Sequence, residues 1–205
     1  MRQIDKQTDE PNDPVAFADA YLERLGETLR ALDTRSIGRF AKILIEASEC
    51  GARIFFIGNG GSAATVSHFA NDLAIGTQAV AKPFRAISLV DNVAILTAIA
   101  NDDGYDEVFV QQLRAHLTPG DVVVAISASG NSANVVDAVR YANDHGAVTV
   151  GLTGFGGGAL RTLVGHNVHV PSQVGEYGPV EDAHLVVNHL VGAYLRDHVR
   201  RRAVP

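Results

Sequence analysis

Histidine and carboxylate residues recur at helical spacing in two parts of the sequence. His68 and Asp72 lie four positions apart in "VSHFANDLA", so on a helix their side chains project from one face. Such a pair can act on a proton together or hold a metal ion. Near the C-terminus, Glu181 and His189 follow the turn "GEYGP" and lie about two helical turns apart, close enough to converge on one pocket. A carboxylate and a histidine together suffice to take a proton beside a carbonyl group and to protonate its oxygen.

A glycine-rich loop precedes the first of these pairs. The segment "GNGGSAA", residues 58 to 64, follows an apolar run and opens a helical pattern, and it contains Asn59, Gly60 and Ser62. Its glycines do not have the G-x-G-x-x-G spacing of a dinucleotide-binding fingerprint. Unpaired N–H groups and the positive end of the helix dipole favour an anion at such a place. The alternative interpretation is a tight turn that binds nothing.

A serine-rich loop follows a later apolar run in the same way. In "ISASGNSAN", residues 126 to 134, the hydroxyl groups of Ser127, Ser129 and Ser132 surround Gly130 and Asn131. One serine is a common helix cap, but three hydroxyl groups so close together indicate a ligand. The loop contains neither Lys nor Arg and lacks the G-K-[ST] ending of a nucleotide-binding P-loop. We therefore expect a phosphate monoester held by hydroxyl groups and backbone dipoles.

The elements that must position these residues alternate along the chain. Two helical patterns come first, in "DPVAFADAYLERLGETLRALD" and "TRSIGRFAKILIEASECG". Short apolar runs then alternate with helical segments, and these runs cover residues 52–58, 84–90, 121–127, 147–154 and 167–172. Such a pattern predicts an α/β fold, a doubly wound, flavodoxin-like sandwich with a five-stranded parallel sheet behind two N-terminal helices.

The predicted fold determines where a ligand binds. In sheets of this kind ligands bind at the carboxyl ends of the strands, so we expect the loops at 58–62, 127–132 and 172–181 to lie together. A chain of 205 residues suits one compact domain. We expect a polar tail over residues 1–13 and a single domain over residues 14–205 that includes the N-terminal helices.

Composition argues against two classes of partner. The formal net charge is −6, whereas a nucleic-acid surface needs clustered Lys and Arg. No apolar stretch reaches the roughly 18 residues of a membrane span, and the polar N-terminus has no apolar segment typical of a secretory signal. We expect a cytoplasmic protein with a small-molecule ligand and neither nucleic acid nor membrane as partner.

Quoted together, "GNGGSAA" and "ISASGNSAN" resemble the sugar isomerase, or SIS, family of phosphosugar-binding domains over about residues 14 to 198. The segments "SHFANDLA", "AIANDDGYDEVF" and "EDAHLVVNHL" are most similar to its sedoheptulose 7-phosphate isomerase (phosphoheptose isomerase) group. This resemblance implies an aldose–ketose isomerase that forms D-glycero-D-manno-heptose 7-phosphate through an enediol-type intermediate. It also implies a homotetramer whose active sites lie between subunits.

The resemblance also implies roles for individual residues. The phosphate ligands would be Ser127, Ser129 and Ser132, with Asn59, Gly60 and Ser62. Asn101 and Asp102 would bind sugar hydroxyl groups, although a turn with a helix cap explains them equally well. Asp72 and His189 would shuttle protons. A zinc ion would be held by His68, Asp72, Glu181 and His189.

Three positions depart from the family pattern. Ala128 stands where the family often has threonine, Asp72 where it has glutamate, and Glu181 where it has glutamine. The Ala128 change removes one hydroxyl group from the phosphate loop. The changes at Asp72 and Glu181 leave three interpretations open: the base has moved from Asp72 to Glu181, two histidines and two carboxylates form a stronger metal site, or the substrate is another phosphosugar. A non-enzymatic adaptor of the replication-initiator-binding type is a further alternative. His189 argues against it, because an adaptor has no need of a proton carrier.

Overall fold

The computed structural model describes residues 13–79 and 81–203. Two helices come first, as predicted: α1 (Pro14–Arg30) and α2 (Thr34–Cys50). Each follows an aspartate, Asp13 or Asp33, whose carboxylate accepts a hydrogen bond from the backbone two residues on, which satisfies a free N–H group of the first turn. The predicted polar tail, residues 1–13, lies outside the described residues except for Asp13.

Five parallel strands form one sheet in the order β2-β1-β3-β4-β5. The strands are β1 (Arg53–Gly58), β2 (Arg85–Ser88), β3 (Val122–Ser127), β4 (Val148–Thr153) and β5 (His166–His169). This confirms the predicted doubly wound α/β fold, although β5 ends at His169, three residues earlier than expected. Chain order reverses at β1, where Gly58 pairs with Ile126 of β3. The loops after β1 and β3 therefore lie side by side, as the topology requires of a ligand-binding edge.

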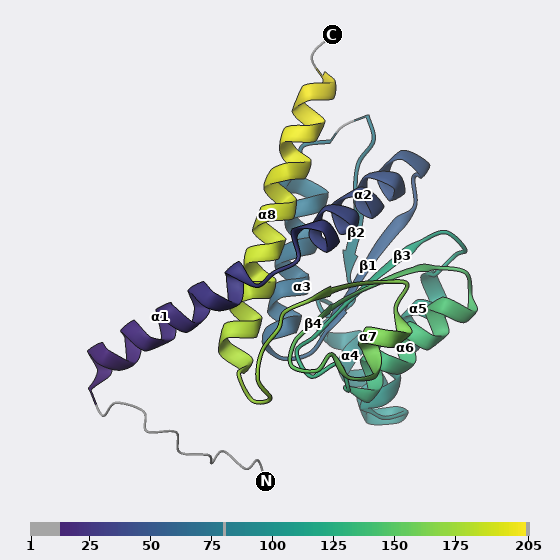
Figure 1. Ribbon diagram of the computed structural model, residues 1–205. Coiled ribbons are helices and arrows are strands. Elements are labelled where there is room, and N and C mark those ends of the chain that lie inside the picture. The colour runs from purple at the N-terminus through teal and green to yellow at the C-terminus, as the bar shows by residue number, and fades with distance from the viewer. Residues whose placement is uncertain (1–12, 80, 204–205) are drawn as a thin grey trace.

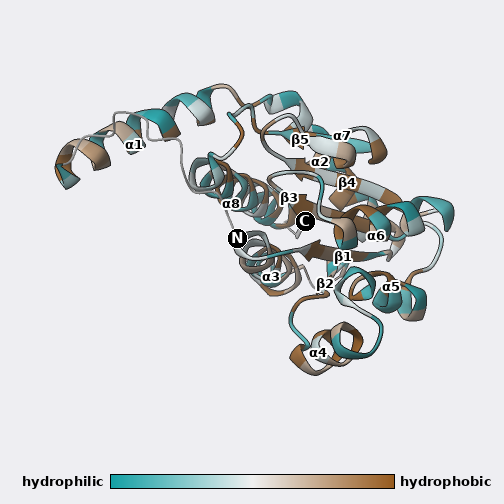
Figure 2. Ribbon diagram, turned by 90° about the horizontal axis from the view of Figure 1, so that it is seen from below, coloured by the Kyte–Doolittle hydropathy of each residue, from teal (hydrophilic) through white to brown (hydrophobic). Residues whose placement is uncertain are grey.

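Side chains alternate between the two faces of the sheet, and helices bury both faces. In β1, Ile54 and Phe56 belong to one core, which includes residues of α2, α3 and α8. Phe55 and Ile57 belong to a second core with residues of α5, α6 and α7. These helices are α3 (Gly61–Asn71), α5 (Val110–His116), α6 (Ala133–Asp144), α7 (Gly158–Leu163) and α8 (Tyr177–Ala203). Figure 2 shows the sheet between the two helical layers.

The helix α4 (Val93–Asp102) lies at the edge of the molecule and contains no fully buried residue. Its sequence is nevertheless largely apolar, and Val93 is 68% exposed. Figure 2 shows α4 as a mostly hydrophobic helix beyond β2. Exposed apolar surface of this kind is typical of an interface.

The first helix, α1, crosses the beginning of α8 (Figure 1). The guanidinium of Arg24 donates two hydrogen bonds to the carboxylate of Glu176, at 2.7 and 2.8 Å. Tyr21 donates to Asp182, and burial, together with this carboxylate, raises the pKa of Tyr21 to about 12. These contacts anchor the turn that precedes α8. Within the described residues no helix is both long and apolar enough to cross a membrane.

Candidate active site

The glycine-rich loop connects β1 to α3 and is tied to the neighbouring loop by side chains. The amides of Asn59 and Asn134 donate to each other at 2.9 and 3.0 Å. The hydroxyl of Tyr105 also donates to the Asn59 oxygen, at 2.9 Å. This network joins the glycine loop to the first turn of α6 and to the segment after α4. Sequence reasoning did not assign Asn134 or Tyr105, although both lie within the segments "ISASGNSAN" and "AIANDDGYDEVF" that carry the resemblance.

The serine-rich loop after β3 presents hydroxyl groups at the start of α6. The Ser127 Oγ accepts a hydrogen bond from the N–H of Gly130 at 3.1 Å, and the Ser129 Oγ accepts one from the N–H of Asn131 at 3.3 Å. A hydroxyl that accepts a hydrogen bond can still donate its own proton to a ligand. Ser132 occupies the N-cap position of α6, but its side chain makes no capping hydrogen bond. Three hydroxyl donors and the positive end of α6 thus suit an anion.

Gly130 is required at the centre of this loop. Its φ is +66°, a conformation that residues with a side chain rarely adopt. A Cβ atom there would also overlap the backbone carbonyl of Gly157. The serine loop therefore packs tightly on the backbone at Gly157, and this packing keeps it in the shape that presents its hydroxyl groups.

Glu181 lies in the first turns of α8, beside the start of α3. Its carboxylate packs so closely on Gly61 that a Cβ atom at position 61 would overlap it, with Oε1 only 2.8 Å away. Burial raises the pKa of Glu181, and the neighbouring carboxylate of Asp182 adds to this shift. A carboxyl group with a raised pKa beside a loop that suits an anion is a candidate acid–base group.

A second group of titratable side chains lies further along α3 and α8. The Nε2 atoms of His68 and His189 are 3.0 Å apart, and His68 Nε2 lies 3.3 Å from Asp72 Oδ2. The three ligand atoms all lie within 4.8 Å of one another. Asp72 is also the first residue of a π-helical turn, Asp72–Gly76. Such turns recur at functional sites, because the wider turn changes the direction of a side chain.

This second group, which we call the His–Asp cluster (His68, Asp72 and His189), fits a metal ion. Two nitrogen ligands of one tetrahedral zinc ion, each about 2.0 to 2.1 Å from it, lie about 3.3 Å apart. The N···N and N···O separations of 3.0 and 3.3 Å are close to that value. The described residues therefore contain a possible metal site of two nitrogens and one oxygen.

The predicted fourth ligand, Glu181, is not part of the His–Asp cluster. Gly61, against which Glu181 packs, precedes His68 by seven residues of α3, a rise of about 10 Å. Asn101 and Asp102 are the last residues of α4, exposed and hydrogen-bonded to each other at 2.8 Å. Within one chain, the predicted residues thus lie in two separate places: the loops at the strand ends, which suit a phosphate, and the titratable His–Asp cluster.

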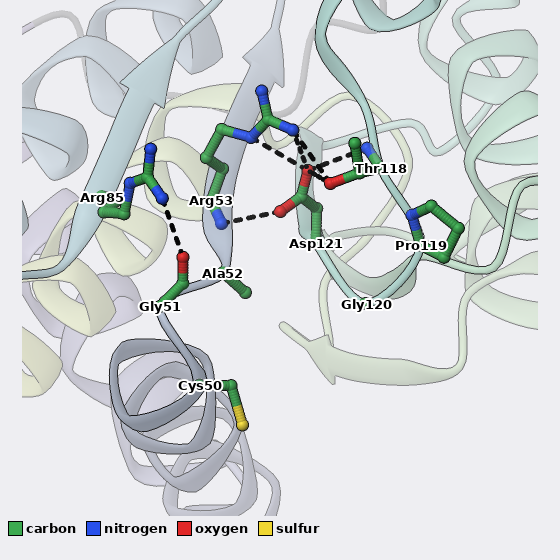
Figure 3. Close-up of a pocket in the computed structure, with 9 residues that line it drawn as sticks. All are labelled: Cys50, Gly51, Ala52, Arg53, Arg85, Thr118, Pro119, Gly120 and Asp121. Atoms are coloured by element: carbon green, nitrogen blue, oxygen red, sulfur yellow. Dashed lines mark hydrogen bonds and ion pairs between the residues drawn. The ribbon is translucent and has the colours of Figure 1, made fainter.

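A cavity of about 490 Å³ lies elsewhere, at the amino ends of the strands (Figure 3). Its charged groups already have partners: Arg53 binds Asp121 through its backbone N–H and its side chain, at 2.8 and 3.1 Å. Arg85 donates to the carbonyl of Gly51 at 3.0 Å. None of the predicted site residues lines this cavity, so we place the active site at the opposite edge.

The structure thus combines a doubly wound sheet, two neutral loops at adjacent strand ends that suit an anion, and a histidine–carboxylate group on the helices behind them, which is the architecture expected of an α/β protein with a phosphorylated ligand. A family model described as "SIS domain" matches residues 17–154. The phosphoheptose isomerase of Geobacter metallireducens is 42% identical over 77% of this chain and 82% of its own length. That of Rhodospirillum rubrum is 37% identical over 88% of this chain and 92% of its own length.

Solved structures agree with these sequence matches. A phosphoheptose isomerase from Neisseria gonorrhoeae superposes with a TM-score of 0.79 at 30% identity, over 89% of this chain and 97% of its own. One from Francisella tularensis gives a TM-score of 0.81 at 26% identity, over 90% of this chain and 99% of its own. The chain belongs to the SIS domain family and, within it, to the phosphoheptose isomerases. The resemblance expected from the two loops is thereby confirmed.

Proposed function

We propose that this chain interconverts sedoheptulose 7-phosphate and D-glycero-D-manno-heptose 7-phosphate through an enediol-type intermediate. Membership of the phosphoheptose isomerases supports the reaction class and a sugar-phosphate substrate. The observation that carries the proposal is the convergence of His68, Asp72 and His189, because this reaction needs a base and an acid on neighbouring substrate atoms. The glycine loop lies at the start of α3, the helix that carries His68, and the serine loop lies beside it.

The phosphate is held by the serine loop in this proposal. Ser127, Ser129 and Ser132 donate their hydroxyl protons to its oxygens, and the N-terminus of α6 adds its dipole. The glycine loop contributes Ser62 and backbone N–H groups at the start of α3, whereas Asn59 holds the two loops together. Binding energy from a phosphate remote from the reacting carbons then supplies positioning.

Proton transfer is assigned to Asp72 and His189. Their ligand atoms lie within 4.8 Å of each other and of His68, so one can take the proton beside the carbonyl while the other protonates the oxygen. Glu181, beside the glycine loop, binds sugar hydroxyl groups. The alternative assignment makes Glu181 the base, and its raised pKa is the observation in favour of that alternative.

A zinc ion is the metal proposed for the His–Asp cluster, with His68, Asp72 and His189 as ligands. A bound zinc ion would polarise a carbonyl oxygen as a Lewis acid. Metal occupancy and the choice of base are linked, because a ligated His189 has no free lone pair for a proton and a ligated Asp72 carboxylate, although it keeps free lone pairs, is a weaker base. Glu181 would then be the carboxylate left to accept it.

The test is turnover of sedoheptulose 7-phosphate with analysis of the sugar product, for Asp72→Asn and Glu181→Gln beside the wild type. Each protein is assayed after chelation and again after zinc is restored. We expect Asp72→Asn to lose about 10²-fold or more after chelation, while Glu181→Gln retains most activity. The reverse order would make Glu181 the base. No product from a wild type that still binds phosphate would favour a non-enzymatic adaptor.

We further propose a homotetramer with active sites between subunits. Val186, Leu190 and Tyr194 form one stripe on α8 and are 38%, 49% and 50% exposed. The exposed His189 adjoins this stripe. A subunit packed on the stripe would therefore cover the His–Asp cluster and bring its own loops close to it.

Mixing two inactive variants tests this shared site. Ser129→Ala lacks a phosphate ligand and His189→Ala lacks a proton carrier, so each homotetramer is expected to be impaired. If the two halves of a site come from different subunits, mixed tetramers contain some sites with both halves intact and regain activity. Mixed tetramers, verified by mass spectrometry, that stay inactive would contradict the shared site.

A further inference from the structure

The inner face of α8 is apolar with two polar exceptions. Val187, Val191 and Leu195 are fully buried in the core, and so are His184 and Asn188. An amide buried among apolar side chains is costly unless its polar atoms find partners. Asn188 is therefore expected to have a role that offsets this cost.

The partner of Asn188 is the carboxylate of the His–Asp cluster. Its Nδ2 lies 3.4 Å from Asp72 Oδ2, and the same oxygen lies 3.3 Å from His68 Nε2. The Oδ1 atom of Asn188 has no hydrogen-bond partner among the described residues. The buried amide of Asn188 thus donates one hydrogen bond, to Asp72 of the His–Asp cluster.

The surroundings of Asp72 explain why its carboxylate needs a fixed partner. Asp72 begins the π-helical turn after α3, so the backbone that follows Asp72 no longer has regular α-helical geometry. On α8, Gly192 faces the carboxylate, and even a Cβ atom at position 192 would lie 3.8 Å from Oδ2, an ordinary van der Waals contact that would not hold the carboxylate in place. Asn188 is thus a hydrogen-bond donor on α8 that can limit rotation of the carboxylate.

We propose that Asn188 is a positioning residue, which orients Asp72 Oδ2 toward His68 and His189. The inference rests on the proposed function of the His–Asp cluster. The amide N–H occupies one lone pair of the oxygen and leaves another directed at the cluster. Donors behind a ligating carboxylate commonly contribute 10- to 100-fold in metal affinity.

Asn188→Leu separates this role from a structural one. Leucine has nearly the shape of asparagine and matches the apolar neighbours, and it removes the unpartnered Oδ1. If Asn188 positions Asp72, zinc affinity falls about 10- to 100-fold, whereas the melting temperature of the chelated protein does not fall. A purely structural role predicts a lower melting temperature with zinc affinity unchanged. Val187→Ala is the matched control, because Val187 lies in the core beside Asn188.

The experiment measures zinc affinity by competition with a chromophoric chelator, thermal unfolding in chelator, and the crystal structures of wild type and Asn188→Leu. We expect the Asp72 Oδ2 to His68 Nε2 contact to be lost in the variant. A variant that keeps this contact and wild-type zinc affinity would overturn the proposal. Asn188→Ser, with a shorter donor, replaces the leucine variant if that variant does not fold. A wild type without zinc affinity would refute the metal assignment, and the crystal structures would still decide the role of Asn188.

Discussion

The buried histidine of α8, His184, gives the protein a predictable sensitivity to acid. His184 is completely buried, and neither ring nitrogen has a hydrogen-bond partner among the described residues. Burial lowers its pKa from 6.5 to about 4. The nearby Thr153 backbone partly opposes this shift without forming a hydrogen bond of normal geometry, and the charge of His169 adds to it.

The sign and size of this acid sensitivity follow from the difference in proton binding between the folded and the unfolded chain. The unfolded chain takes up a proton on His184 near pH 6.5, whereas the folded chain takes it up only near pH 4. The folded state is therefore favoured fully above pH 6.5, and stability falls as the pH falls toward 4. The difference between a pKa of 6.5 and a pKa of about 4, at about 1.4 kcal/mol for each tenfold change in proton affinity, corresponds to about 3 kcal/mol. Roughly 2 kcal/mol of this is expected to be lost by pH 5.

Urea unfolding at a series of pH values measures this effect, with His184→Leu compared with wild type. The leucine variant should lose less stability between pH 7 and pH 5 than wild type, by roughly 2 kcal/mol. His116→Gln, at an exposed position, controls for the removal of any histidine and should retain the wild-type slope. Identical slopes for wild type and His184→Leu would show that His184 is not the source of the acid sensitivity.

Three further predictions concern single contacts. Gly61→Ala should leave the free energy of unfolding within about 1 kcal/mol of wild type, since alanine favours a helix. The added methyl group displaces Glu181, so kcat/KM should fall by about 10²-fold, and wild-type kinetics would contradict this prediction. His189→Ala should reduce turnover by at least about 10²-fold, and an unchanged rate would remove His189 from the mechanism. Arg24→Met breaks the doubly hydrogen-bonded ion pair with Glu176, which lowers the pKa of Glu176. In denaturant unfolding, the variant should lose about 1 kcal/mol of unfolding free energy at pH 7 and less below pH 4, where Glu176 becomes protonated. An equal loss at both pH values would show that the ion pair is not its cause.

Much of the fold could be predicted because it depends on local pattern and on topology. The alternation of short apolar runs with helices predicted the parallel sheet, and the rule for strand ends predicted that the loops after β1 and β3 would meet. The pairing of Gly58 with Ile126 is the register that brings them together. The spacing of His68 and Asp72 predicted a shared face, and the two side chains do approach each other.

The remaining features depend on packing between elements, which spacing along one helix does not reveal. The two-turn separation of Glu181 and His189 suggested that they could share one pocket, but the Glu181 carboxylate packs on Gly61 at the start of α3 and is not part of the His–Asp cluster. The π-helical turn at Asp72 has no simple sequence signal. Asn188 occupies a helix face that is otherwise mostly apolar, so its contact with Asp72 becomes apparent only when α3 and α8 are side by side.

A crystal structure of the assembled protein with sedoheptulose 7-phosphate would show the proposed site itself. We expect the phosphate among the hydroxyl groups of Ser127, Ser129 and Ser132, with the carbonyl end of the sugar at His189 of the same or a neighbouring subunit. A phosphate bound away from these serines, or a carbonyl end distant from His189 in every subunit, would contradict the proposed site.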